Sequence, residues 1–212
     1  MKKKMFDGYS QKEEFLNIVT HGFGFLLSLI AFPYIVQKAL SYDQLWMTTS
    51  LCIYGLSLMV LFLASTLYHA SKNPRNRRKL KIFDHAAIYV LIAGSYSPFC
   101  LVALNSSLGW YMFIAVWIFA LVGVVLKLFF TGRFDKISTL MYVLMGWQVV
   151  LFINPLMEVL SENGLNFLIA GGIFYTIGAI LYLIQKIPYN HAIFHVFVLL
   201  GGLSHFIAIY TL

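Results

Sequence analysis

The sequence predicts an all-α integral membrane protein that crosses the bilayer with seven helices. Of its 212 residues, 60% are hydrophobic and only 11% are charged, whereas soluble domains carry about 25% charged residues. The chain therefore has too little polar surface for a soluble globular protein. Its apolar residues also fall into seven runs long enough to span a hydrocarbon core, which takes about 20 helical residues.

We place the spans, in order, at about 15–38, 46–69, 83–104, 109–130, 137–157, 166–185 and 191–211. Runs such as 56–67 and 116–130 lack the alternating pattern of barrel strands, and each span must satisfy its own backbone hydrogen bonds, so each is predicted to be a helix. Residues 1–14 are expected to form a cytoplasmic N-terminal segment. Residues 15–212 are expected to form a single domain, because the connections between spans are short.

Polar or turn-forming residues mark the limits of these spans. Glu13 and Glu14 precede the first apolar run, which is of full spanning length, so a cleavable signal peptide is not expected. The other limits are Asn73-Pro74-Arg75 before the third span, Asn105-Ser106-Ser107 before the fourth, Lys127, Arg133 and Lys136 around the next connection, Asn163-Gly164 before the sixth, and Lys186 before the seventh. Pro33, Pro98 and Pro155 are expected to kink the helices that contain them.

The basic residues predict the orientation of the chain in the membrane. The formal net charge is +7, and seven alternating spans place nearly all basic residues on one side, with Lys38 as the exception. Because short cytoplasmic loops are enriched in Lys and Arg, the N-terminus is predicted to be cytoplasmic and the C-terminus exterior. We interpret the basic cluster at 72–81 as a topology determinant that can also touch anionic headgroups. The expected partners are therefore membrane lipids, with no nucleic acid and no protein partner indicated.

Several mechanisms are disfavoured by motifs that the sequence lacks. It contains no phosphate-cradling glycine loop, no Walker lysine and no Gly-x-Ser-x-Gly elbow, which argues against ATP-driven and ordinary serine-hydrolase mechanisms. Cys52 and Cys100 lie inside apolar runs and are interpreted as small core residues rather than a disulfide framework.

Three histidines predict a metal site inside the membrane. His191 and His195 lie one helical turn apart at the start of the last span, and His69 closes the second span. If the spans alternate, all three imidazoles reach the same depth on the same side. Three neutral nitrogen ligands leave a fourth position open, which is typical of catalytic zinc sites. The alternative is that each histidine only bonds a neighbouring carbonyl group.

Two polar residues near these histidines have both a catalytic and a structural interpretation. Asp84, at the start of the third span, is either a helix N-cap or a carboxylate that holds and deprotonates a metal-bound water. Ser65, one turn before His69, either bonds back to the Leu61 carbonyl or orients Asp84 and donates to a developing oxyanion. His85 points away from Asp84 on a helix and is left out of the ligand set.

A further polar stripe lies in the first span. Glu14, Asn17 and His21 are spaced three and four residues apart, so they share one helix face. They either support the metal site or pin neighbouring helices, and the packing interpretation is the simpler one. His205 lies near the far side of the membrane and is interpreted as a packing residue.

Three motifs together resemble the hemolysin III branch of the progestin and adipoQ receptor (PAQR) family over nearly the whole chain. They are Glu14-x-x-Asn17-x-x-Thr20-His21, Ser65-x-x-x-His69 followed by Asp84, and His191-x-x-x-His195. The resemblance implies zinc held by His69, His191 and His195, with Asp84 reaching it through water. It also implies kinship with alkaline ceramidases, which cut a lipid amide. His85 departs from the receptors, which usually carry an aromatic residue there, so their ligand preferences do not transfer.

These features predict a multi-pass cell-membrane protein that acts as a zinc-dependent hydrolase on a lipid amide or ester in the cytoplasmic leaflet. Zinc would lower the pKa of its bound water toward about 7, with Asp84 as the general base. The first alternative is a non-enzymatic receptor or homeostasis factor in which zinc is structural. The second is a pore-forming cytolysin, which the uniformly apolar spans disfavour.

Overall fold

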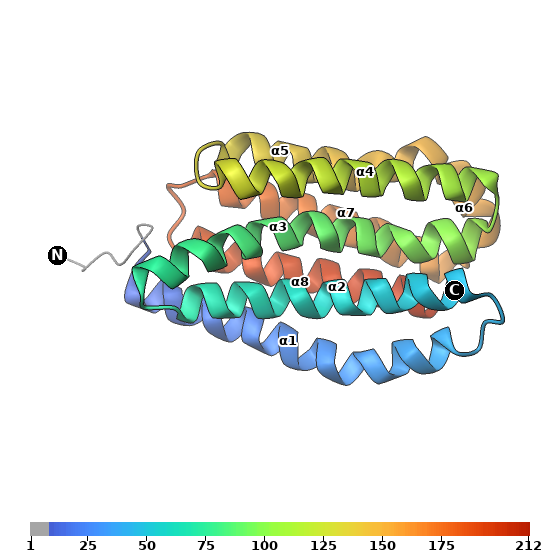
Figure 1. The fold of residues 1–212 in the computed structure, drawn as a ribbon, viewed down its shortest axis with the longest axis horizontal. Helices are drawn as coiled ribbons and strands as arrows, with labels where there is room; N and C mark the ends of the chain where they lie inside the picture. The colour runs from blue at the N-terminus through green and yellow to red at the C-terminus, as the bar shows by residue number, and fades with distance from the viewer. Residues whose placement is uncertain (1–8) are drawn as a thin grey trace.

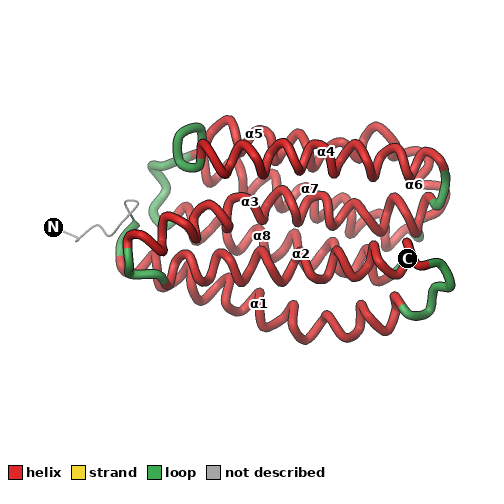
Figure 2. The backbone as a smooth tube through the Cα atoms, viewed as in Figure 1, coloured by secondary structure: helices red, strands yellow, loops and turns green. Residues whose placement is uncertain are grey.

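The computed structural model describes residues 9–212, whose helices lie side by side in a bundle (Figures 1 and 2). Within this part, seven helical segments are long and apolar enough to cross a membrane. The chain is a multi-pass membrane protein, as predicted. The elements are α1 (Gln11–Ala39), α2 (Leu45–Ala70), α3 (Pro74–Pro98), the π-helix η2 (Phe99–Leu104), α4 (Ser107–Phe130), α5 (Asp135–Gly146), the 3-10 helix η3 (Trp147–Phe152), α6 (Ile153–Val159), α7 (Glu162–Leu183) and α8 (Asn190–Tyr210). No strand element occurs in this described part. Residues 1–8 of the expected N-terminal segment lie outside it.

The third span begins nine residues earlier than predicted. Asn73 caps α3 by accepting hydrogen bonds from the backbone N–H groups of Arg75 and Asn76, and Pro74 occupies the first helical turn. Both residues favour a helix start. Hydropathy alone misses this start because the first turns of α3 are basic. Asp84 consequently lies well inside the helix, so its interpretation as an N-cap is wrong.

The fifth span is interrupted rather than continuous. It runs as α5, η3 and α6 over Asp135–Val159. The Tyr96 hydroxyl, from α3, fills the break: it accepts a hydrogen bond from the Val149 N–H (2.8 Å) and donates one to the Gly146 carbonyl (2.5 Å). These bonds satisfy backbone groups that a change of helix type would otherwise leave without partners.

The helices alternate in direction, so α1, α3, α5 and α8 begin at one end of the bundle, where α2, α4 and α7 finish (Figure 1). We call this the histidine end, because the end of α2 brings His69 to it and the start of α8 brings His191. Helix α2 packs between α1 and α3, and α8 packs against α7 and α1. Large apolar side chains such as Phe129 and Leu151 cover the outer faces, as expected for a surface in contact with lipid.

Small residues allow the helices to approach closely. A Cβ atom at Gly24 of α1 would lie 2.7 Å from Leu199 of α8 and 2.8 Å from Phe62 of α2. A side chain at this position would therefore require Leu199 or Phe62 to shift, and small residues of this kind are common where helices pack in lipid. Cys52 and Cys100 are free thiols, the latter fully buried, in agreement with their interpretation as small residues inside the bundle.

Candidate metal site

The three predicted histidines converge on one point at the histidine end. His69, from the last turn of α2, places its Nε2 atom 3.2 Å from Nε2 of His191, and Nε2 of His195 lies 3.1 Å from the same atom. All three residues are buried, and their nitrogen atoms lie within 4.8 Å of one another. The i, i+4 spacing places His191 and His195 on one face of α8, and the antiparallel α2 brings His69 to them. This three-histidine cluster could hold a metal ion.

Glu14 fixes the orientation of the His69 ring. Its Oε2 atom lies 2.7 Å from Nδ1 of His69, and the carboxylate is buried. Because a carboxylate only accepts hydrogen bonds, Nδ1 carries the proton and Nε2 presents its lone pair to the cluster. Asn17 lies against the same nitrogen at 3.3 Å. The Asn17 atom at this distance is Nδ2, which is itself a donor, so Asn17 packs against Nδ1–H without a hydrogen bond, and its amide oxygen has no hydrogen-bond partner in the described chain.

Arg77 holds Glu14 in place from the first turns of α3. Its guanidinium pairs with the second carboxylate oxygen of Glu14 and donates to the Tyr68, His69 and Ser71 carbonyls at 3.3–3.4 Å. These carbonyls belong to the last turn and the C-cap of α2, where a helix leaves carbonyl groups that its own N–H groups cannot all satisfy. Arg77 is itself buried. It therefore caps α2 and neutralises Glu14 at the same time.

Thr20 performs the corresponding role for His195. Its Oγ1 atom lies 3.3 Å from Nδ1 of His195, while its hydrogen goes to the Leu16 carbonyl at 2.7 Å. With its only hydrogen committed, the hydroxyl accepts from Nδ1–H, which leaves Nε2 of His195 as a lone-pair donor. Two of the three Nε2 atoms are thus held in the tautomer that a metal requires.

Asp84 and Ser65 lie beside the cluster rather than in it. Asp84 is buried and lines the same cavity as His191 and His195, but it does not belong to the group of atoms that could share one ion. The Ser65 hydroxyl interacts with the Asp84 carboxylate, although no hydrogen bond of ordinary length joins them. The Ser65 hydroxyl makes no hydrogen bond of ordinary length to any described residue, so the structural alternative for Ser65, a bond back to the Leu61 carbonyl, is not formed.

The remaining histidines occupy separate positions. The His21 ring stacks on His195, with centroids 3.5 Å apart and planes 5° from parallel. All three residues of the polar stripe on α1, Glu14, Asn17 and His21, therefore face the three-histidine cluster. His85 lines the cavity but not the cluster. His205 lies far from it, where its Nε2 donates to the Leu168 carbonyl at 3.3 Å and its ring packs on Tyr175, in agreement with its interpretation as a packing residue.

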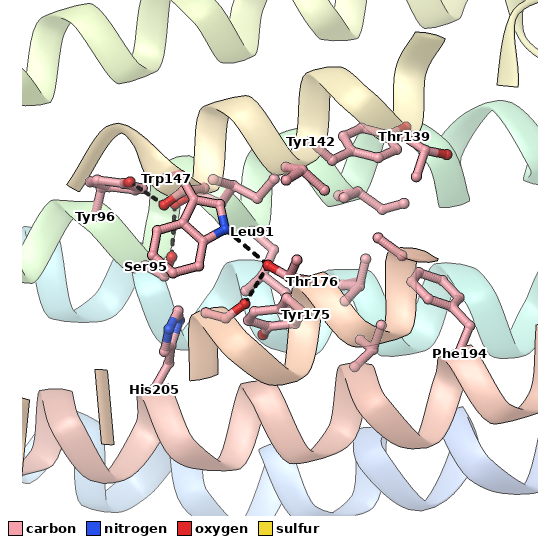
Figure 3. A pocket seen from close by; sticks show the side chains of 18 of the residues that line it. Leu91, Ser95, Tyr96, Thr139, Tyr142, Trp147, Tyr175, Thr176, Phe194 and His205 are labelled. Atoms are coloured by element: carbon pink, nitrogen blue, oxygen red, sulfur yellow. Dashed lines mark hydrogen bonds between the residues drawn. The ribbon is translucent and has the colours of Figure 1, made fainter. Parts of the chain in front are cut away.

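A cavity of about 340 Å³ extends from the cluster into the bundle between α3, α5, α7 and α8. Figure 3 shows Tyr142 and Thr139 near one end and His205 near the other, with Trp147 bonded to Thr176 across the space between α7 and the interrupted span. Most lining side chains are apolar. A chamber of this size and character is suited to a flexible apolar chain.

Sequence reasoning missed the roles of Arg77 and Thr20. Arg77 was grouped with the topology-determining residues, yet it lies seven residues before Asp84 and so on the same face of a helix that begins at Pro74. The Asn73-Pro74 start signal would have revealed this. Thr20 belongs to the motif Glu14-x-x-Asn17-x-x-Thr20-His21, which marked its place but not its role, because only the packing of α1 on α8 brings it to His195.

The fold and the cluster define a class of protein: a membrane protein with seven spanning helices and a buried three-histidine site that could bind a metal ion. An apolar cavity leads to this site. The chain belongs to the Haemolysin-III related family, whose model matches residues 9–206.

Relatives of the chain agree with this assignment. It is 42% identical to Hemolysin-3 of Bacillus cereus over 198 residues, which cover 93% of this chain and 90% of that protein. It is 43% identical to the Hemolysin-3 homolog of Bacillus subtilis (strain 168) over 201 residues, covering 95% and 94%. It is 28% identical to the monocyte to macrophage differentiation factor of Homo sapiens over 211 residues, covering 93% and 83%. No solved structure matches the chain.

Proposed function

We propose that the protein is a zinc-dependent hydrolase that cleaves an amide or ester bond of a membrane lipid and so contributes to membrane lipid homeostasis. The observation that carries this proposal is the convergence of three Nε2 atoms at the end of an apolar cavity that Asp84 also lines. We also propose that the histidine end faces the cytoplasm, because the basic residues of 72–81 and of the α4–α5 connection lie there.

The donor set fits zinc. Tetrahedral zinc with Zn–N bonds of about 2.0–2.1 Å needs ligand nitrogens about 3.3 Å apart. Nε2 of His191 lies at a similar distance from Nε2 of His195 (3.1 Å) and of His69 (3.2 Å), and all three ligand atoms lie within 4.8 Å of one another. Glu14 and Thr20 supply the hydrogen bonds from Nδ1 that typically accompany zinc-bound histidines. Three protein ligands would leave one position for a water or a substrate oxygen, the arrangement of catalytic sites.

When bound, zinc would supply a Lewis acid and a water acidic enough to react near neutral pH. The Asp84 carboxylate would take the proton from the attacking water and return it to the leaving nitrogen or oxygen. The water oxygen would end on the acyl carbon as the C–N or C–O bond breaks, giving a carboxylic acid and an amine or alcohol. Ser65, which has no other partner in the described chain, would orient Asp84, and the apolar cavity would hold the acyl chain.

Turnover by purified protein tests the proposal. Detergent-purified wild type with zinc should release fatty acid from a mixture of amide-linked and ester-linked lipids, as measured by mass spectrometry. His191→Ala should lose both zinc and product, and Asp84→Asn should lose product while retaining zinc. His205→Ala, which alters a histidine of the same cavity away from the cluster, is the matched control and should retain zinc. Absence of product from zinc-loaded wild type, or equal product from His191→Ala, would rule out the hydrolase.

One observation favours a second candidate, a non-enzymatic receptor or homeostasis factor with structural zinc. The cluster joins α2 to α8, and its hydrogen-bond partners lie on α1, so a bound ion would tie three helices together. In that case Asp84→Asn should leave the cellular phenotype intact, whereas His69→Ala should lower the melting temperature and abolish the phenotype.

The names of the bacterial relatives raise lysis as a third activity. The mainly apolar lining of the cavity does not suit the passage of ions. Dye release from liposomes by nanomolar protein, increasing with oligomer formation, would be needed to support a pore.

A further inference from the structure

Lys127 places a buried ammonium group on the wall of the cavity. It belongs to the last turn of α4 at the histidine end, where a lysine would ordinarily extend into the headgroup region. Its neighbours Leu126, Leu128 and Phe129 are exposed on the outer face of the bundle, but Lys127 is only 2% exposed and lines the cavity. An inward-facing lysine of this kind marks a functional site more often than a packing position.

No acceptor in the described chain receives a hydrogen bond from this ammonium group. Its nearest anionic atom is Oδ1 of Asp135, at 4.0 Å, which is beyond hydrogen-bond reach. That oxygen is also buried without a hydrogen-bond partner. The Tyr142 ring centroid lies 5.9 Å away, near the limit of a cation–π contact. Since buried charged groups are normally hydrogen-bonded, the pair leaves room for a third group.

Lys127 and Asp135 form a polar corner of the cavity that is continuous with the proposed reaction site. Lys127 and Asp135 line the same cavity as Asp84, His191 and His195. Tyr142 connects the two places, because its ring lies beside Lys127 and its hydroxyl donates to the backbone oxygen of His85 at 2.9 Å. Figure 3 shows Tyr142 and Thr139 together on the α5 side of the cavity. Lys81 of α3 adds a second positive charge to the corner.

We propose that Lys127 binds an anionic oxygen, a carboxylate or a phosphate, on the lipid whose apolar chain fills the cavity, so that the cavity selects acidic lipids over neutral ones. This inference rests on the proposed function in taking the cavity as the lipid site, and it names the class of lipid. Asp135 reduces the preference for acidic lipids, because its negative charge, 4.0 Å from the Lys127 ammonium group, lowers the positive potential at the place where the anionic group would bind.

Two matched pairs of lipids test the selection. The first pair is a fatty acid and the fatty alcohol of the same chain length, and the second is phosphatidic acid and the matching diacylglycerol. Binding to purified protein is measured by native mass spectrometry after removal of metal with a chelator, so that a carboxylate or phosphate cannot gain affinity by ligating the ion. The readout does not depend on hydrolysis.

Wild type should prefer the acidic member of at least one pair by about tenfold to a hundredfold, the range expected for hydrogen bonds to a buried charge. Lys127→Met should abolish that preference without changing the binding of the neutral member, and Lys127→Arg should retain it. The pair that loses its preference identifies carboxylate or phosphate as the ligand group. Lys136→Met removes an exposed charge from the adjoining segment and should change neither pair.

Asp135→Asn provides a test of opposite sign that keeps the lysine in place. It should increase the preference for the acidic lipid, because the competing carboxylate is removed, and it decides the question if Lys127→Met does not fold. Equal binding of acidic and neutral lipids by wild type, a preference that survives in Lys127→Met, or an unchanged preference in Asp135→Asn would overturn the inference. A preserved preference without any hydrolysis would instead overturn the hydrolase and leave the inference standing.

Discussion

Replacing Glu14 by Gln should weaken zinc binding by orienting His69 less well. The carboxylate accepts from Nδ1 of His69 at 2.7 Å and pairs with Arg77. A Gln amide oxygen can still accept from Nδ1–H, but hydrogen bonds to a charged acceptor are about twice as strong as neutral ones. Loss of such supporting partners typically costs about 10–100-fold in metal affinity, which corresponds to about 1.4–2.8 kcal/mol. Competition with a chromogenic chelator measures this loss.

The same substitution should also destabilise the fold, because it removes the negative charge that Glu14 presents to the buried Arg77 guanidinium. Breaking a buried ion pair from one side costs about 3–5 kcal/mol, which unfolding in mixed micelles can measure. The double variant Glu14→Gln/Arg77→Met removes both charges of this pair, so stability should recover relative to Glu14→Gln alone. Zinc affinity should remain low, because the charged acceptor for His69 is still missing.

This separation of the two effects is the critical result. If zinc affinity returned together with stability in the double variant, the loss in Glu14→Gln would reflect folding alone and the orienting role would be refuted. Wild-type affinity in Glu14→Gln would refute it directly. Glu162→Gln, an exposed first-turn glutamate at the opposite end of the bundle, is the matched control and should leave both quantities unchanged.

Three further outcomes follow from the structure. Thr20→Val should lower zinc affinity about fivefold, as expected for one lost hydrogen bond of about 1 kcal/mol, and Thr20→Ser should restore it. Chelator competition measures the zinc affinity of both variants. Wild-type zinc affinity in Thr20→Val would show that His195 needs no such partner. Gly24→Ala should cost about 1–3 kcal/mol of stability through overpacking. Gly146→Ala is the control and should leave stability unchanged, because its new Cβ would meet nothing within 4 Å. Equal melting temperatures of the two variants would contradict the close packing at Gly24. Chelation should lower the stability of zinc-loaded protein by about 2.7 kcal/mol when free zinc had been at 100 times its dissociation constant; an unchanged melting temperature would mean that the folded state holds no zinc.

Much of the site could be predicted from the sequence because its elements are local or set by length. The spacing of His191 and His195 fixes their common helix face in any α-helix. The depth of His69 follows from counting apolar spans, since each helix must cross the same hydrocarbon thickness. Hydropathy places the start of α3 too late, because it detects only the part of a helix that lies in lipid, whereas Asn73-Pro74 is a helix-start signal that marks the true beginning.

Only the tertiary structure decided which faces of the helices meet. The stripe of Glu14 and Asn17 had a packing and a supporting interpretation, and the fold places it against His69. Lys127 was assigned to the membrane surface, and the fold turns it into the cavity. Hydropathy cannot choose between such alternatives, because lipid tails and neighbouring helices are equally apolar surroundings for a helix in the membrane. Composition and length therefore determined the number of spans and the depth of each residue in the membrane. The rotation of each helix about its own axis was set by side-chain packing and by buried polar contacts between segments far apart in the chain.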